Sequence, residues 1–293
     1  MTASVIDDAS SNSPMPRSRP GAPLALPHEF ALLDRVLAPG ALSTQFQPIV
    51  DIRTPTPAIV AVECLTRGIR GSSLEAPDVL FAFARRKRAE AVVDRAAIAT
   101  ALASATSLPE ALPLHLNVHA STLSCDETLP TFVELNAEAN GIALSRLIFE
   151  IIEHAAAIDE YLLLRSLETF RSRGIGIALD DIGHGHSNFH MMLLTRPGIL
   201  KVDRYVVYGI ADDPIRQTVV AKLREVALAL PALIVAEGIE TLEDLETLRS
   251  LGVHQGQGYL FGKPASAAEL VECTLVQDLV RRAGSCHPSP STL

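Results

Sequence analysis

The feature that most constrains the fold is a regular alternation of short apolar runs with longer segments of helical spacing. The alternation repeats at intervals of roughly 30 residues, which is typical of β-α units with parallel strands. Strands are expected at 43–52, 58–65, 114–118, 147–153, 175–179, 198–203 and 232–238, and helices at 28–37, 78–105, 155–173, 214–230 and 242–251. Seven or eight such units fit a closed barrel of about 250 residues better than two open sheets. We therefore predict an α/β fold, a TIM-like (β/α)8 barrel.

Polar side chains recur where the expected strands end. In barrels of this kind the chemistry sits at the carboxyl ends of the strands, because the loops that follow them gather on one face. A single acid at a strand end is commonplace, but several at successive strand ends predict a shared pocket. The residues concerned are Glu63, Asn117, Glu150, Asp180, Asp181, Lys201 and Glu237.

The stretch 175–189 carries two adjacent acids at the end of an apolar run. Ile175 to Leu179 reads as a buried strand that stops at Asp180 and Asp181, with a glycine at Gly183. Neighbouring strand residues point to opposite faces, but where the pleat breaks both acids can turn toward one point. Carboxylates so close repel each other unless a cation lies between them. Taken alone, the stretch is equally compatible with a polar strand end or a helix N-cap.

The collected donors indicate a metal site with oxygen ligands. Five negative charges in one pocket need roughly two divalent cations and a lysine to be tolerable. Oxygen ligands favour Mg²⁺ or Mn²⁺ over Zn²⁺. Two ions about 3.5–4 Å apart suit phosphodiester hydrolysis. Lys201 is suited to hold the attacking water or to neutralise the charge that develops.

Composition and charge narrow the class of protein further. A chain of 293 residues with 48% hydrophobic content can bury a large core, and its net charge of −9 argues against DNA as the main partner. The apolar region 223–239 is interrupted by Arg224, Pro231 and Glu237, so no membrane span is expected. Four irregularly spaced cysteines match neither a zinc site nor a disulfide framework. We expect a cytoplasmic protein with reduced thiols.

Several motifs, in order and spread from about Gln47 to Pro264, resemble the EAL-domain family. They are Glu63-Cys-Leu65 with Arg67, Asn117, Phe149-Glu150-Ile-Ile-Glu153, Asp180-Asp181, Lys201-Val-Asp203, Ala236-Glu237-Gly-Ile-Glu-Thr241 and Gln257-Gly-Tyr-Leu-Phe-Gly-Lys-Pro264. The resemblance implies a barrel of the EAL type that acts as a cyclic di-GMP phosphodiesterase and cuts the ring to linear pGpG. It further implies Mg²⁺ or Mn²⁺ as cofactor, as two ions, and inhibition by Ca²⁺.

The resemblance also implies a role for each matching residue. Glu63, Lys201 and Glu237 would be catalytic, with Lys201 positioning the water. Arg67 would bind a substrate phosphate, while Gln47, Leu65 and Gln257 would lie at the substrate or at metal-bound water. Glu153 would brace the loop after the Asp pair. The metal ligands would be Glu63, Asn117, Glu150, Asp180, Asp181 and Glu237.

The chain departs from the family pattern in two places. Cys64 stands where the family usually has Ala. In the loop after the Asp pair, the usual Phe, Thr, Tyr, Ser and Leu are replaced by Ile182, His184, His186, Asn188 and Phe189. In relatives this loop links metal binding to dimerisation. The altered loop therefore leaves two properties undecided, the turnover rate and the coupling of dimerisation to metal binding. The alternatives are a catalytically weak or inactive module that binds cyclic di-GMP or a partner protein as a sensor or adaptor, and an enzyme for another phosphodiester.

The remaining expectations concern domain organisation and partners. Residues 1–27 are expected to be a disordered arm, 28–283 a single barrel domain and 284–293 a disordered tail. The resemblance implies a homodimer through the loop after Asp181 and adjacent helices, and leaves room for a protein partner. The basic run 85–88 is read as a solvated helix face in preference to an anion site. His115 and His119 are read as space-filling or capping residues.

Overall fold

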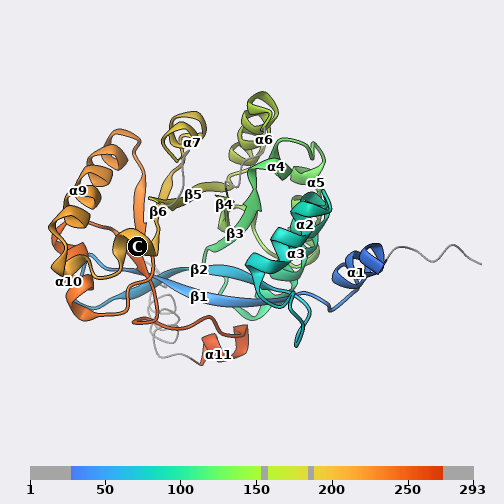
Figure 1. The fold of residues 1–293 in the computed structure, drawn as a ribbon, viewed down its shortest axis with the longest axis horizontal. Coiled ribbons are helices and arrows are strands. Elements are labelled where there is room, and N and C mark those ends of the chain that lie inside the picture. The colour runs from blue at the N-terminus through green and yellow to red at the C-terminus, as the bar shows by residue number, and fades with distance from the viewer. Residues whose placement is uncertain (1–27, 153–157, 184–187, 273–293) are drawn as a thin grey trace, which may run out of the picture.

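The strands of the protein close into a barrel in the computed structural model, which describes residues 28–152, 158–183 and 188–272 (Figure 1). Neighbouring strands follow chain order, and the last strand pairs back with the first. They are β1 (Ser43–Asp51), β2 (Ala58–Arg67), β3 (Leu114–His119), β4 (Leu147–Ile152), β5 (Gly176–Ile182), β6 (Ile199–Val202), β7 (Leu233–Ala236) and β8 (Gln255–Gln257). The predicted α/β barrel is confirmed.

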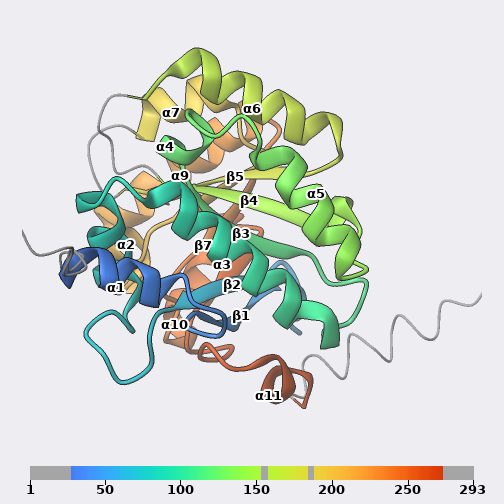
Figure 2. The ribbon, with the colours of Figure 1, turned by 90° about the vertical axis from the view of Figure 1, so that its right-hand side faces the viewer.

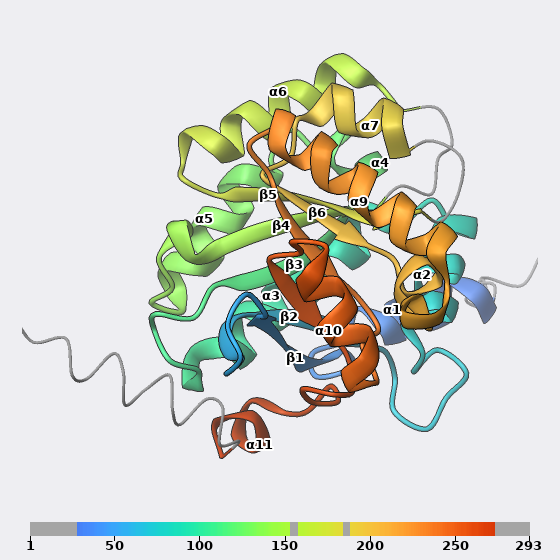
Figure 3. The same cartoon turned by 90° about the vertical axis from the view of Figure 1, so that its left-hand side faces the viewer.

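Helices cover the outside of the barrel. Figure 2 shows α3 and α5 over one side of the strands, and Figure 3 shows α7, α9 and α10 over the opposite side. The α-helices are α1 (His28–Val36), α2 (Pro77–Arg86), α3 (Glu90–Ser104), α4 (Ala120–Leu123), α5 (Leu129–Ala139), α6 (Glu160–Ser172), α7 (Asn188–Thr195), α8 (Arg204–Val207), α9 (Pro214–Ala229), α10 (Leu242–Ser250) and α11 (Ala267–Val271). Short 3₁₀ helices are η1 (Ala105–Ser107), η2 (Leu144–Arg146) and η3 (Ile210–Asp212).

Strand β1 departs from the expected parallel arrangement, because it is antiparallel to both of its neighbours, β2 and β8. The segment that joins β1 to β2 spans 52–57 and contains Pro55 and Pro57. A parallel pair needs a crossover of a dozen or more residues, so this short connection can only form a hairpin. The remaining neighbours, from β2 round to β8, pair in parallel as predicted.

The single helix predicted over 78–105 is wrong, because the structure has two helices, α2 and α3, with a break between them. Arg88 adopts a left-handed backbone with φ 53°. The amide of Ala89 donates to the carbonyl of Ala84 at 2.9 Å, which closes the end of α2. The guanidinium of Arg85 contacts Glu90 across the break, with Nε and Oε1 3.1 Å apart. Nothing in the local composition signals this break, since the left-handed position usually carries glycine.

Strand alternation divides the side chains between a large outer core and a small inner one. Outward-facing strand residues such as Phe149 and Leu200 pack beneath the helices in the main apolar cluster. Inside the barrel, Ile49, Ala61 and Val235 form a small apolar layer. The next inward side chains toward the carboxyl ends of the parallel strands are polar. The barrel interior therefore has an apolar layer, followed by a polar layer toward the carboxyl ends of the parallel strands.

Several expectations concern residues outside the described part of the chain. These are the N-terminal arm at 1–27, the tail at 284–293, and Glu153, His184 and His186. Among the helices that are described, none combines the length and apolarity needed to cross a membrane.

The break after α2 generates a stability prediction. Replacing Arg88 by glycine should raise the free energy of unfolding by about 1 kcal/mol, because a left-handed backbone costs a side chain roughly that much. The matched control is Arg86→Gly in the regular last turn of α2, which should lower the free energy of unfolding by about 0.5–1 kcal/mol. Urea unfolding measures both variants. A loss of stability in Arg88→Gly equal to that in Arg86→Gly would contradict the strained backbone.

Candidate functional site

The polar layer of the barrel brings together residues that lie far apart in sequence. Strand register sets Gln47 opposite Glu63, Glu63 beside His115, and Asn117 beside Glu150. Because side chains alternate along a strand, residues two positions apart face the same way, so His115 and Asn117 both point inward. The predicted convergence of strand-end residues is thus a consequence of barrel closure.

Lys201 lies at the centre of this layer and is only 1% exposed. Its Nζ lies 2.7 Å from Glu150 Oε2 and 2.7 Å from Glu237 Oε1. It also lies 3.1 Å from Asp180 Oδ1 and 3.3 Å from Glu63 Oε2. A buried ammonium is tolerated only when it is paired, and here carboxylates from β2, β4, β5 and the end of β7 supply the pairing.

Side-chain amides hold Glu63 in place. Asn117 Nδ2 donates to Glu63 Oε1 at 2.9 Å, and Gln257 Nε2 donates to Glu63 Oε2 at 2.7 Å. Gln257 Nε2 also donates to Gln47 Oε1 at 3.0 Å, while Gln47 Nε2 donates to the Gly262 carbonyl at 3.1 Å. Gln47 and Gln257 therefore belong to the support of Glu63, whose carboxylate is fixed on both oxygens.

His115 is a member of this network that the sequence reading missed. Its Nδ1 lies 2.6 Å from Glu150 Oε1, and both side chains are buried. Burial and then the charge of Lys201 lower the pKa of His115 to about 3, so the ring is neutral, and its Nδ1 shares a hydrogen bond with the Glu150 carboxyl group. The position two residues before Asn117 is the signal that could have identified it. His119 fills space, one of the two expected roles, with its ring against Phe81 and its Nδ1 2.9 Å from Asp94 Oδ1; its side chain does not cap α4.

The carboxylates have very different proton affinities. Burial raises the pKa of Glu63, but attraction by Lys201 and the hydrogen bonds from Asn117 and Gln257 outweigh it and bring the pKa to about 2. Burial raises the pKa of Glu150 well above its usual value, and repulsion by Glu63 adds to this. Glu63 is consequently the firmly ionised acid of the layer.

The remaining members show that negative charge is in excess. Burial raises the pKa values of Asp180 and Glu237 despite the nearby ammonium, because the other acids repel their charged forms. Burial lowers the pKa of Lys201, but the surrounding acids drive that pKa well above its usual value. One ammonium does not neutralise this set of acids, and an added cation would stabilise their ionised forms.

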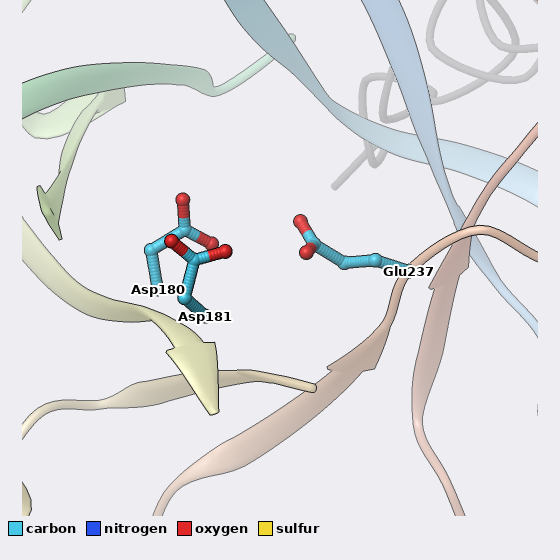
Figure 4. Close-up of side chains that lie close together, drawn as sticks. All are labelled: Asp180, Asp181 and Glu237. Carbon is cyan, nitrogen blue, oxygen red and sulfur yellow. The ribbon is translucent and has the colours of Figure 1, made fainter. Parts of the chain in front are cut away.

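The two adjacent acids of β5 do turn toward one point. The pairing of β5 with β6 shifts register between Leu179 and Ile182, and Asp181 has a left-handed backbone with φ 56°. Figure 4 shows the carboxylates of Asp180 and Asp181 side by side, with that of Glu237 directed toward them from the end of β7. One oxygen from each of these acids lies within 4.8 Å of the others. The predicted break of the pleat is confirmed.

The donor set fits a hard divalent cation. Asp180, Asp181 and Glu237 offer carboxylate oxygens, which Mg²⁺ and Mn²⁺ prefer. Asn117 adds a carbonyl oxygen, Oδ1, that is buried and accepts no hydrogen bond within the described residues. A buried acceptor without a donor is costly, and coordination to a cation would satisfy it.

Two pockets open beside the polar layer. One of about 380 Å³ is lined by Glu63, Asn117 and Asp180 at its inner end, and Leu65 contributes to its wall. The other, of about 230 Å³, is lined by Gln47, Glu237 and Gln257.

Arg67 is half-buried at the end of β2 and lines neither of these two pockets. Its Nε donates to Gln45 Oε1 at 2.9 Å and its Nη1 to the Thr66 carbonyl at 3.1 Å. Glu63, Leu65 and Arg67 are alternate residues of β2, so their side chains lie on the same face of the strand. The guanidinium is therefore held just beyond the acids, on the side where the strand ends.

The EAL domain family matches residues 31–264. The chain is 31% identical over 231 residues to the cyclic di-GMP phosphodiesterase PA2567 of Pseudomonas aeruginosa, which is 77% of this chain and 38% of that protein. It is 36% identical over 122 residues to the probable cyclic di-GMP phosphodiesterase PdeD of Escherichia coli, which is 41% of this chain and 22% of that protein. The chain thus spans less than half the length of these relatives.

Solved structures share the fold. The calcium and cyclic di-GMP complex of Klebsiella pneumoniae BlrP1 matches with a TM-score of 0.69 and 25% identity, over 78% of this chain and 56% of that chain. The cyclic di-GMP-bound form of a standalone EAL protein from Vibrio cholerae O395 matches with a TM-score of 0.67 and 26% identity. The match covers 77% of this chain and 93% of that chain.

The site generates a prediction about cation binding. Mn²⁺ at 100 times its dissociation constant should stabilise the wild-type protein by about 2.7 kcal/mol, because it binds only the folded acids. Asp181→Asn should lose most of this stabilisation. The control Asp212→Asn, an exposed acid in η3, should retain it. Thermal unfolding with and without Mn²⁺ provides the measurement, and equal stabilisation of Asp181→Asn and wild type would remove Asp181 from the cation site.

Proposed function

This chain belongs to the EAL domain family, and from that premise we propose that it is a metal-dependent phosphodiesterase that hydrolyses cyclic di-GMP to linear pGpG. One observation carries the proposal, namely the buried ammonium of Lys201 ringed by the acids of four strands beside an open pocket. Relatives named as cyclic di-GMP phosphodiesterases, and folds solved with that nucleotide, support the choice of substrate.

The proposed metal ligands are the oxygen donors of the polar layer. A complex of BlrP1 with manganese and cyclic di-GMP supports the use of a divalent cation here. Two bound ions would lower the pKa of an attacking water and offset the negative charge of the phosphate. We assign Mg²⁺ or Mn²⁺ as the working ions and expect Ca²⁺ to bind without supporting turnover. The ligands would be Glu63, Asn117, Glu150, Asp180, Asp181 and Glu237.

The chain's own residues then supply positioning and charge. Lys201, held at 2.7 Å by both Glu150 and Glu237, would orient the attacking water through its Nζ and stabilise the charge that develops on phosphorus oxygens. Attraction by Lys201 and the hydrogen bonds from Asn117 and Gln257 keep Glu63 ionised, so its carboxylate is available as a cation ligand near neutral pH. Rigid support of this kind is what a hydrolytic site requires.

The neighbouring residues would bind the substrate. Arg67 is assigned to a phosphate, because a planar guanidinium suits two parallel hydrogen bonds to phosphate oxygens. Leu65 contributes apolar wall to the larger pocket, and Gln47 and Gln257 line the smaller one. Glu153, outside the described residues, is assigned to bracing the loop that follows Asp181.

We further propose that two copies associate beside this loop. Helix α7, which follows this loop in the chain, and α6, which packs against α7, expose large apolar side chains, Leu193 and Tyr161, each more than 70% exposed. Exposed apolar surface of this kind marks interaction sites. The folded unit is proposed to be one barrel domain over 28–283.

The first test of function is product formation. Purified protein incubated with cyclic di-GMP and Mg²⁺ or Mn²⁺ should form pGpG, which chromatography detects. Glu63→Ala or Glu237→Ala should each reduce the rate of hydrolysis at least about 100-fold, because each removes a metal ligand and misplaces the attacking water. Glu138→Ala on the surface of α5 is the control. Thermal unfolding checks that each variant folds. A folded Glu63→Ala protein with near-normal turnover would exclude this residue, and tight binding without product would identify a sensor.

A second test separates substrate binding from cation binding. Arg67→Ala should weaken cyclic di-GMP binding about tenfold while leaving stabilisation by Mn²⁺ intact, since a guanidinium cannot coordinate a cation. Calorimetric titration in Ca²⁺ measures the dissociation constant, with Arg86→Ala as the control arginine. An unchanged dissociation constant in Arg67→Ala would contradict the assignment to phosphate.

A further inference from the structure

One face of helix α2 forms a wall of the 380 Å³ pocket. Asp78, Phe81 and Arg85 line this pocket together with Glu63 and Asp180 of the polar layer. Their spacing of three and then four residues places them on one side of the helix. A carboxylate, an aromatic ring and a guanidinium therefore face the same cavity as the proposed metal ligands.

We propose that this face of α2 recognises the guanine base of the substrate, with Asp78 and Arg85 as specificity-determining residues; this rests on the proposed function. Guanine carries donors on N1 and N2 and acceptors at O6 and N7. The Asp78 carboxylate is an acceptor for the N1 and N2 protons, and the Arg85 guanidinium is a donor to O6 and N7. Adenine has an acceptor at N1 and a donor on N6. The Asp78 carboxylate would then face an acceptor and the Arg85 guanidinium a donor, which disfavours adenine.

The wall is preorganised for a flat ring. Arg85 Nε contacts Glu90 Oε1 at 3.1 Å, and Glu90 Oε2 accepts a hydrogen bond from Ser121 Oγ at 3.1 Å. This contact uses Nε, and within the described residues the terminal amino groups of Arg85 make no hydrogen bond, so they can donate to a ligand. The ring of Phe81 packs against that of His119 with centroids 4.9 Å apart. Groups already held in place lose less entropy when a ligand binds, which favours affinity.

A purely structural role makes a different prediction. Asp78 lies in the first turn of α2 and Arg85 in the last turn, where each charge stabilises the helix dipole. Loss of that effect would change stability but would affect two purine nucleotides equally. Arg86 also lies in the last turn but does not line the pocket, so it is a matched control for Arg85.

The experiment measures discrimination between two cyclic dinucleotides. Dissociation constants for cyclic di-GMP and cyclic di-AMP are determined in Ca²⁺ for the full chain and for Asp78→Asn, Arg85→Gln and Arg86→Gln. Wild type should prefer cyclic di-GMP. Asp78→Asn and Arg85→Gln should each lose at least about fivefold affinity for cyclic di-GMP, with cyclic di-AMP unchanged within about twofold. Arg86→Gln should match wild type for both.

Other outcomes overturn the inference. Equal losses for both nucleotides, or no loss in either variant, would show that α2 does not recognise the base. Asp78→Ser, which keeps a residue suited to a helix start, repeats the measurement if Asp78→Asn does not fold. If wild type binds neither nucleotide and forms no pGpG, the proposed function fails as well. If wild type hydrolyses cyclic di-GMP and the variants discriminate as it does, only this inference fails.

Discussion

The buried ammonium of Lys201 is the interaction on which the rest of the site depends. Its Nζ lies within 3.3 Å of an oxygen of each of four acids, which reach it from β2, β4, β5 and the end of β7. Without this charge the acids would repel one another across the barrel interior, and with it they are drawn to a common point. One side chain on β6 thereby fixes the positions of residues separated by more than a hundred positions in sequence.

Closure of the barrel makes this arrangement possible. Parallel strands bring their carboxyl ends to one rim, and alternation sends every second side chain inward. Strand β1 runs in the opposite direction, so its inward polar residue, Gln47, precedes its inward apolar residue, Ile49, whereas in β2 the apolar Ala61 precedes Glu63. The reversed order keeps the polar layer at the same height on both strands, as the pairs Gln47 with Glu63 and Ile49 with Ala61 show.

The site keeps features that reduce stability. Asp181 occupies a left-handed backbone that side chains rarely adopt, and burial raises the pKa values of Glu150, Asp180 and Glu237. Strain and uncompensated charge of this kind cluster at functional sites, where a ligand relieves them. The apolar cluster between the strands and the outer helices stabilises the barrel and offsets these costs.

The sequence by itself determined the α/β barrel and the strand ends that carry acids, because these follow from periodicity and from chemistry within a few residues. It left open whether Asp180 and Asp181 turn to one point, which the register shift of β5 and the left-handed backbone of Asp181 decided. Tertiary structure alone decided the rest. The bond between His115 and Glu150 and the amide support of Glu63 depend on register between strands, which one strand's pattern does not encode. The left-handed turn at Arg88 carries no local signal, since glycine is absent there. The opposite pKa shifts of Glu63 and Glu150, both acids at strand ends in sequence, arise from burial and neighbours that exist only once the barrel has closed.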